Sequence, residues 1–488
     1  MVVINLPLVA RLLSPALFYV GLIGLIPLAY SLITLTEGLM SFLPMCAAAI
    51  GLSQVLRQIG RHARTVLTIR DLFLFTVSLW TSVTVIAAIP IYLMLEDVSV
   101  AGSLFESASA LSTTGATVIN GLETRPPAIL LWRSILQFLG GIGFVVIGVA
   151  ILPSFSLGGI NIFKTESTSF DGNAKLTPHL KTMAFYILVW YLGNCVLCTV
   201  SYFLCGHDLF LALNAAMCTV ATGGMMPLDA SMNDLSAGAH YTAIVFMYLG
   251  SVPFLVVLAS LSVNLLKLRY FFKDEQVRGY TLFILVLSAA IALSLVLKND
   301  YPVERAIRVA LFNVVSILST SGFALEDFTA WNSFSTILFM IIFAIGGCSG
   351  STSGGLKYFR LQVCFAMFKS QLVKSVHPHR AIEPRFNGRR VSPETLRAVI
   401  TYLVSYVLVL IASSILATLM GLNITDAITA SITCLSNVGP AMGYELGPTS
   451  NFAYLSDSLH LLFAFDMLMG RLEIIPVLLC MTRMFWKF

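Results

Sequence analysis

Apolar residues along this chain form long uninterrupted runs, unlike the one-faced or alternating patterns of soluble helices and strands. Runs of about 20 apolar residues are long enough to cross the hydrocarbon core of a bilayer as a helix. Such segments are expected at 7–30, 38–56, 71–95, 127–153, 182–205, 240–266, 280–297, 332–366, 395–420 and 457–482. The sequence therefore predicts an all-α polytopic membrane protein whose first apolar run is retained as a helix.

A run of glycine and hydroxyl residues interrupts the segment at 332–366. Glycine costs about 1 kcal/mol relative to alanine in a helix, and irregular backbone at membrane depth is tolerated only where protein buries it or a water-filled cavity borders it. The run therefore predicts a broken membrane helix and a candidate gate. Its candidate gating residues are Gly346, Gly347, Ser349, Gly350, Gly354, Gly355 and, just after the run, Lys357.

Four short segments with a central glycine recur about 100 residues apart, which indicates an internal repeat. They contain Thr113-Thr114-Gly115, Ala221-Thr222-Gly223, Thr320-Ser321-Gly322 and Asn437-Val438-Gly439. Each segment follows a stretch too short to span a membrane, at 101–111, 208–219, 302–318 and 425–435, and precedes a long apolar stretch. One such segment alone is more often a packing or loop glycine. Their recurrence favours pore helix, filter and inner helix, repeated four times.

The repeat gives a domain organisation for the whole chain. Residues 1–65 contain two apolar runs and no glycine segment, so they are expected to stand outside the repeat as two extra N-terminal helices. Four pseudo-symmetric helix–pore-loop–helix repeats around one pore are expected at 66–163, 164–279, 280–376 and 377–488, the last including a basic cytoplasmic linker.

Composition and charge agree with this organisation and orient it. Hydrophobic residues make up 57% and charged residues 11% of the chain, whereas soluble proteins have about 25% charged residues. Most Lys and Arg gather at 57–70, 164–181, 267–278 and 357–397, so by the positive-inside rule these loops and both termini are expected to be cytoplasmic. The glycine segments then lie on the outer side. Acidic residues downstream of them suggest a cation-attracting vestibule: Glu123, Asp229, Glu326, Asp327 and Glu445.

The glycine segments have the chemistry that a monovalent cation requires. Backbone carbonyls can replace the hydration shell of the ion without a fixed anion that would hold it too tightly. A central glycine can take φ > 0 and turn carbonyls toward the pore axis. A short helix before each segment would direct its negative C-terminal end at the ion.

Charged residues within apolar segments have structural and functional interpretations. A buried Arg471 costs at least about 2.5 kcal/mol on insertion scales, so it requires a partner. It is either half of a structural ion pair or an electrostatic barrier below the filter. Lys357 could act similarly or could extend to the cytoplasmic boundary. For Glu106, in the first short helix, a structural role is favoured.

Enzymatic alternatives find little support in the sequence. His240, His460 and Asp466 could be catalytic, but no His-Glu-x-x-His or Gly-x-Ser-x-Gly motif is present. The glycine run lacks the Gly-Lys-Ser/Thr ending of a phosphate loop, so no ATPase activity is expected. No organic cofactor and no nucleic-acid partner are expected either. Cys195 and Cys198 are interpreted as ordinary small residues of an apolar helix.

Several of these motifs together resemble the Trk/Ktr/HKT superfamily of potassium transporters, and within it the TrkH/TrkG type. They are the four filter segments, the stretch from Leu131 to Gly141, the run from Gly346 to Lys357, and Met469-Gly470-Arg471-Leu472-Glu473. The resemblance covers nearly the whole chain, and the two N-terminal helices are similar to TrkH.

That resemblance implies a function, a location and partners. It implies potassium uptake across the bacterial cytoplasmic (inner) membrane, with K⁺ held by filter carbonyls and gating by the intramembrane loop and Arg471. It also implies a homodimer and a cytoplasmic TrkA-type nucleotide-binding subunit. The second filter reads Ala-Thr-Gly-Gly and the fourth Asn-Val-Gly-Pro, which leaves selectivity among K⁺, Rb⁺ and Na⁺ open. Sodium- or proton-coupled symport is the alternative within this fold, and an intramembrane enzyme is a remote one.

Overall fold

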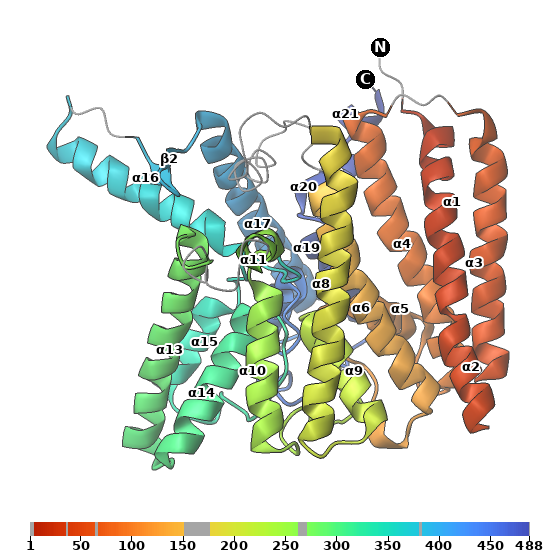
Figure 1. Cartoon of the computed structure of the whole chain (residues 1–488), viewed down its shortest axis with the longest axis horizontal. Helices are drawn as coiled ribbons and strands as arrows, with labels where there is room; N and C mark the ends of the chain where they lie inside the picture. Colours follow the sequence, from red (N-terminus) through yellow and green to blue (C-terminus); the bar gives the residue numbers. More distant parts are fainter. Residues whose placement is uncertain are drawn as a thin grey trace.

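The structure, a computed structural model, describes residues 4–35, 38–63, 67–150, 176–261, 271–379 and 383–487. It is a bundle of helices, and its strands form one small hairpin in the described part of the chain (Figure 1). The predicted all-α membrane class is therefore confirmed. Six helices are long and apolar enough to cross a membrane, and one bent helix pair could form a further span, among the residues that the structure describes.

The N-terminal helices pack beside the start of the first predicted repeat (Figure 1). They are α1 (Leu6–Ile23), α2 (Leu25–Thr34), α3 (Leu39–Ile59) and the 3₁₀ turn η1 (Gly60–His62). The Oγ atom of Ser53 donates to the backbone carbonyl of Ser14 at 2.8 Å and ties α3 to α1. Both α1 and α3 also contact α4 (Ile69–Met94), so these two helices cover one side of the bundle.

The other elements follow the predicted order, and that order is consistent with four repeats. The first two units contain α4, α5 (Val100–Leu111), η2 (Leu122–Thr124), α6 (Pro127–Ala150), α8 (Leu176–Leu204), α9 (Leu209–Val220), α10 (Ala237–Ser251) and α11 (Phe254–Leu261). The last two contain α13 (Glu275–Asn299), α14 (Val303–Leu318), α15 (Ser333–Ile342), α16 (Tyr358–Val376), β1 (Arg385–Phe386), β2 (Arg389–Arg390), α17 (Pro393–Leu419), α18 (Ile424–Ser436), α19 (Asp457–Arg471), α20 (Ile475–Met481) and α21 (Arg483–Lys487).

The four predicted short helices are present as α5, α9, α14 and α18. Side-chain caps define where three of them begin: Ser99 accepts from the backbone N–H of Gly102 at 3.0 Å, Asp208 from that of Leu211 at 3.1 Å, and Asn423 from that of Asp426 at 2.9 Å. Such caps satisfy N–H groups that a helix start leaves without partners. Pro302 precedes α14, where its missing N–H costs nothing.

Two of the predicted spans, at 240–266 and 457–482, are not continuous helices but are broken. The axes of α10 and α11 differ by 100° across the break at Val252 and Pro253. Between α19 and α20, Glu473 and Ile474 take φ values of 64° and 53°. Pro253 lies in the first break and disfavours helical backbone at Val252, which is extended. Pro476 lies in the first turn of α20, where proline is tolerated. Only the break in the third repeat was expected.

The two ends of the bundle differ in what they carry. The start of α1, the C-terminal α21, α16 and the hairpin lie at one end, whereas the α8–α9 and α13–α14 connections lie at the other (Figure 1). Several of the basic residues used to orient the chain are outside the described residues: Arg64, Lys164, Lys175, Lys267, Arg269 and Arg380. The predicted repeat boundaries at 65/66 and 163/164 also lie there.

Candidate functional site

The four glycine segments share one backbone conformation directly after the short helices. Their first residues have left-handed φ angles, 56° at Thr113, 52° at Thr222, 56° at Thr320 and 55° at Asn437. Two residues later stand glycines with positive φ, Gly115, Gly224, Gly322 and Gly439. The N–H group of each middle residue donates to a carbonyl five residues earlier, at 2.8 to 3.0 Å. The segments are therefore structural equivalents.

These glycines bring the four segments into a closed ring. A Cβ atom on Gly115 would lie 2.3 Å from the carbonyl oxygen of Gly223, and one on Gly224 would lie 2.0 Å from that of Ser321. A Cβ atom on Gly322 would lie 1.8 Å from the carbonyl oxygen of Val438, and one on Gly439 would lie 2.5 Å from that of Thr114. Each segment thus places the carbonyl of its middle residue against the glycine of the preceding segment.

The alignment expected for the second segment is wrong by one residue. Gly223 does not have positive φ, whereas Gly224 has φ of 78° and meets the next segment as Gly115, Gly322 and Gly439 do. Ala221 caps α9 and corresponds to Ser112, before the left-handed residue. Two adjacent glycines made the register ambiguous. Matching Thr222 with Thr113 and Thr320 would have resolved it.

Glycines on the inner helices allow the short helices to reach the ring. A Cβ atom on Gly140 of α6 would lie 1.7 Å from the carbonyl oxygen of Leu111, and one on Gly470 of α19 would lie 1.9 Å from that of Leu435. A Cβ atom on Gly250 of α10 would lie 3.1 Å from the carbonyl oxygen of Val220. Small residues permit such close backbone approach between membrane helices.

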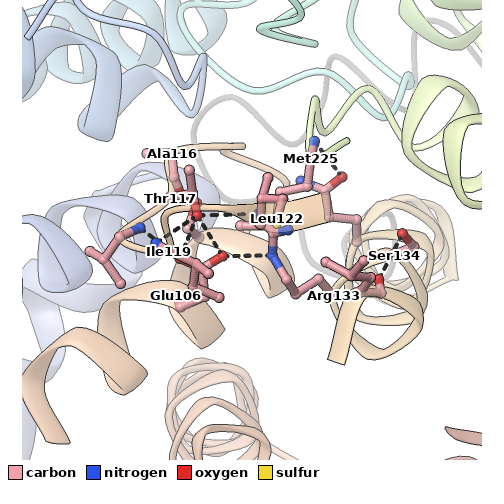
Figure 2. A network of polar contacts seen from close by, with 12 residues as sticks. Glu106, Ala116, Thr117, Ile119, Leu122, Arg133, Ser134 and Met225 are labelled. Atoms are coloured by element: carbon pink, nitrogen blue, oxygen red, sulfur yellow. Dashed lines mark hydrogen bonds and ion pairs between the residues drawn. The ribbon is translucent and has the colours of Figure 1, made fainter. Parts of the chain in front are cut away.

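A buried ion pair anchors the first segment (Figure 2). The carboxylate of Glu106, on α5, lies 2.7 Å from Nε of Arg133, on α6, and both side chains are at most 2% exposed. Glu106 also accepts hydrogen bonds from the backbone N–H of Val118 at 2.9 Å and from Oγ1 of Thr117 at 3.0 Å. These bonds support the structural interpretation of Glu106.

The glycine run between α15 and α16 fills the break between α10 and α11. The backbone N–H of Cys348 donates to the Ser251 carbonyl at 2.8 Å, and that of Thr352 donates to the Gly250 carbonyl at 3.1 Å. In return, the N–H of Phe254 donates to the Gly350 carbonyl at 3.1 Å. Two broken helices thus satisfy each other's backbone groups, as the low dielectric of a membrane demands.

The same run lies against the first residues of the glycine segments. The backbone N–H of Gly354 donates to Oγ1 of Thr320 at 2.7 Å, and Oγ1 of Thr222 donates to Oγ1 of Thr352 at 3.0 Å. A Cβ atom on Gly354 would lie 2.9 Å from Cβ of Asn437. The run therefore contacts three of the four segments at the ends where they leave the short helices.

Two buried cations contact this run. Arg471, at the end of α19, donates to the carbonyl of Thr352 at 2.7 Å and to that of Gly140 at 3.1 Å. Lys357 is 5% exposed, and its Nζ atom donates to the carbonyl of Ser353. The alternative that Lys357 extends to the membrane boundary does not fit this position. One turn on, Arg360 pairs with Glu473 at the α19–α20 break.

The residues considered for catalysis make structural bonds in separate places. Nε2 of His240 lies 2.8 Å from the carbonyl oxygen of Met232, and Nε2 of His460 lies 2.9 Å from that of Phe452. Each histidine thus holds the loop before its own helix. Asp466 accepts a hydrogen bond from Ser413. Cys195 and Cys198 are buried and form no disulfide.

The acidic residues downstream of the glycine segments form local contacts. Glu123 accepts from the backbone N–H of Asp229 at 2.9 Å, which lowers the pKa of Glu123. Glu326 lies 2.7 Å from Arg305, so part of its charge is neutralised. Asp327 and Glu445 also lie on loops after these segments, Asp327 bonding Thr329 at 2.5 Å.

Known proteins resemble this chain over most of its length. The Trk system potassium uptake protein TrkI of Halomonas elongata is 34% identical over 86% of this chain and 84% of its own. TrkH of the same organism is 31% identical over 99% of this chain and 100% of its own. TrkH of Escherichia coli is 30% identical over 90% of each chain.

Structure and family comparisons agree with these relatives. The crystal structure of the potassium transporter TrkH from Vibrio parahaemolyticus superposes with a TM-score of 0.90 at 29% identity, covering 99% of both chains. The family model described as TrkH, cation transport protein, matches residues 39–487. These matches confirm the resemblance drawn from the sequence motifs and identify a transport protein, not an enzyme. The chain belongs to the TrkH family of cation transport proteins.

Proposed function

We propose that this protein takes up potassium across the bacterial cytoplasmic membrane through the ring formed by its four glycine segments. The observation that carries the proposal is the closed sequence of carbonyl-to-glycine contacts that joins all four segments. The middle carbonyls belong to Thr114, Gly223, Ser321 and Val438. The relatives are named as potassium uptake proteins, and the same chemistry suits this chain.

Backbone carbonyls favour a monovalent cation that sheds its water easily. Each carbonyl oxygen carries a partial charge, so several together replace hydration without trapping the ion. The short helices α5, α9, α14 and α18 end at the segments, where their C-terminal dipoles favour a cation. The filter residues in this proposal are those predicted from the sequence, with Gly224 added and Ala221 reassigned as a helix cap.

The glycine run is the proposed gate of this pathway. It contacts the first residues of three filter segments, Thr222, Thr320 and Asn437. Arg471 and Lys357 donate to its carbonyls, so two basic side chains accompany it. A cation leaving the filter toward the end with α16 and the hairpin would meet this backbone and these basic side chains.

Isotope flux into proteoliposomes tests the proposed function. Purified protein should take up ⁸⁶Rb⁺ when a membrane potential is imposed, with K⁺ competing better than Na⁺. A potential of 100 mV supplies about 2.3 kcal/mol per charge, enough to drive uptake without another energy source. Uptake that requires a sodium or pH gradient would favour coupled symport, and absent uptake in correctly inserted protein would contradict the proposal.

Arg471→Gln is expected to raise cation flux by roughly tenfold. Hydrogen bonds from a charged donor contribute about 1.5–3 kcal/mol, and a tenfold change corresponds to about 1.4 kcal/mol. The change removes a positive charge from the pathway and weakens the hold on the Thr352 carbonyl. The measurement is flux per folded molecule after reconstitution.

Arg471→Lys separates charge from hydrogen bonding in this test. Lysine keeps the positive charge, but it cannot reach Thr352 and Gly140 with a planar guanidinium fork. Flux that stays low in the lysine variant identifies charge as the barrier, and flux that rises identifies the bonds to the run. Loss of folded protein in the glutamine variant, with unchanged flux per molecule, would show a purely structural role.

The orientation and partners follow the charge distribution and the resemblance. We expect the end with α16 and the hairpin to be cytoplasmic, together with both termini. Exposed Arg385, Arg389 and Arg390 in the described part of the linker offer basic groups to a TrkA-type nucleotide-binding subunit. Assembly as a homodimer is expected from the resemblance.

A further inference from the structure

One side chain from another repeat contacts the second filter segment. Gln137, on α6, is fully buried. Its Nε2 atom donates to the carbonyl oxygen of Gly223 at 2.5 Å, and its Oε1 atom accepts from the backbone N–H of Met225 at 3.2 Å. The side-chain amide of Gln137 therefore binds the residues on either side of Gly224, which are Gly223 and Met225. The Gly223 carbonyl is one of the four in the proposed ring.

This contact accounts for a glycine that backbone conformation does not require. Gly223 does not have positive φ, so a side chain would meet no left-handed strain there. A Cβ atom on Gly223 would instead lie 2.5 Å from Cδ of Gln137. The equivalent middle residues, Thr114, Ser321 and Val438, all carry side chains. The amide of Gln137 occupies the space that a side chain would take in the second segment.

The corresponding positions of two other repeats, within the described residues, carry no amide. Gln137 precedes Gly140 by three residues, and the residues three before the corresponding glycines Gly250 and Gly470 are Met247 and Met467. Both methionines are buried, and a thioether has no N–H group to donate to a carbonyl. The amide at residue 137 thus gives the ring a chemical asymmetry in its second segment.

We propose that Gln137 positions the Gly223 carbonyl and thereby sets cation specificity. The inference rests on the proposed function, in which the ring binds the passing ion. The hydrogen bond from Gln137 occupies one of the two lone pairs of the Gly223 carbonyl and restrains the movement of this carbonyl. A restrained carbonyl cannot move inward to complete the smaller cage that Na⁺ needs. The other lone pair remains for the larger K⁺.

The anchor of α6 does not depend on Gln137. One turn earlier, Arg133 pairs with Glu106 and its Nη1 atom donates to the carbonyl of Met226 at 3.4 Å. These bonds hold α6 against both the first and second segments. A substitution at Gln137 should therefore release one carbonyl without detaching the helix.

Gln137→Met is the first test, because methionine stands at the equivalent positions of two other repeats. We expect insertion and folded yield to persist. The ratio by which K⁺ inhibits ⁸⁶Rb⁺ uptake better than Na⁺ does should fall several-fold. Met247→Leu is the matched control, a buried substitution at the equivalent place of α10, and should leave the preference unchanged. An unchanged preference in reconstituted Gln137→Met would overturn the proposal.

A double substitution tests the contact itself. Gly223→Ser alone should lower folded yield or flux, because its Cβ atom would collide with Gln137. Gly223→Ser combined with Gln137→Ala removes the collision and makes the second segment read Thr-Ser-Gly, as Thr320-Ser321-Gly322 does. We expect the double variant to recover yield and uptake above Gly223→Ser. A double variant no better than the single one would contradict the contact.

The same assay separates this inference from the proposed function. An unchanged ion preference in the Gly322→Ser protein would show that the ring is not the filter, and both proposals would be wrong. A lowered preference in Gly322→Ser with no change in Gln137→Met would leave the function standing and overturn only the role of Gln137.

Discussion

Gly322→Ser is expected to lower the preference for K⁺ over Na⁺ by roughly tenfold while the protein still inserts and folds. Gly322 has φ of 72°, and its Cβ position lies 1.8 Å from the carbonyl oxygen of Val438. A side chain at positive φ costs about 1–2 kcal/mol, and about 1.4 kcal/mol corresponds to a tenfold ratio. Flux of each ion through the purified variant measures the effect.

The direction of this change follows from how each ion holds its water. The serine Cβ must displace the Val438 carbonyl or turn the Gly322 peptide, and either movement withdraws one oxygen from the ring. Na⁺ holds its water more strongly than K⁺ and gains less from a complete carbonyl cage. Losing one oxygen therefore weakens K⁺ passage more.

Gly421→Ser supplies the matched control. Gly421 also has positive φ, 105°, but nothing lies within 4 Å of its Cβ position. It therefore carries the same kind of backbone strain outside the ring. We expect this variant to keep its ion preference. A Gly322→Ser protein that also keeps its preference would show that Gly322 is not a filter residue.

Deleting Ser349 to Ser353 is expected to raise cation flux at least about tenfold. The deletion removes the residues that bond to the α10–α11 break and to Arg471. The bond from the N–H of Cys348 to the Ser251 carbonyl remains. Backbone hydrogen bonds contribute about 1 kcal/mol each, so losing two or more of them exceeds the 1.4 kcal/mol of a tenfold shift. Flux per inserted molecule is the measurement.

The flanking backbone allows such a deletion. The N–H of Gly346 donates to the Leu356 carbonyl at 2.9 Å, and the N–H of Leu356 donates to the Ala344 carbonyl at 3.0 Å. The two ends of the run are thus already joined, and a shorter connection can link them. Water entering the space can satisfy the carbonyl of Gly250 and the N–H group of Phe254, which lose their partners Thr352 and Gly350.

Ser351→Ala is the control for the deletion. Its Oγ atom donates to the Cys348 carbonyl at 2.6 Å within the run, so its removal leaves the contacts to the filter segments and to α10. Near-normal flux is expected. Reduced flux in an inserted deletion variant would mean that the run is part of the permeation path or of the packing, and not a gate.

Local sequence features predicted much of the candidate site. The short helices were expected from apolar stretches too brief to cross a membrane, and caps such as Ser99 and Asp208 stand where such helices begin. The break in the third inner helix was expected because glycine and serine cannot sustain a helix in lipid. These are properties of neighbouring residues, so they can be read without knowledge of distant contacts.

Other features depended on contacts between distant residues. The second segment was aligned one residue too early because Gly223 and Gly224 are adjacent; the φ of 78° at Gly224 and its approach to the Ser321 carbonyl distinguish the two glycines. The break at Val252 escaped prediction because hydrophobicity remains high on both sides of it, and the break at Glu473 because Arg471 and Glu473 were interpreted as charges within a continuous span. Their stability comes from bonds to the glycine run and from Arg360, which lie far away in the sequence.

The sequence by itself determined the membrane class, the order of the helices and the presence of four glycine segments, because hydrophobicity, helix capping and glycine conformation act over a few residues. Tertiary structure alone decided which carbonyl meets which glycine, that Gln137 lies behind Gly223, and that Arg471 binds the Thr352 carbonyl. Hydrogen bonds and steric contacts depend on distances of a few ångströms, and the fold creates these distances between residues far apart in the sequence, 86 positions for Gln137 and Gly223 and 119 for Arg471 and Thr352.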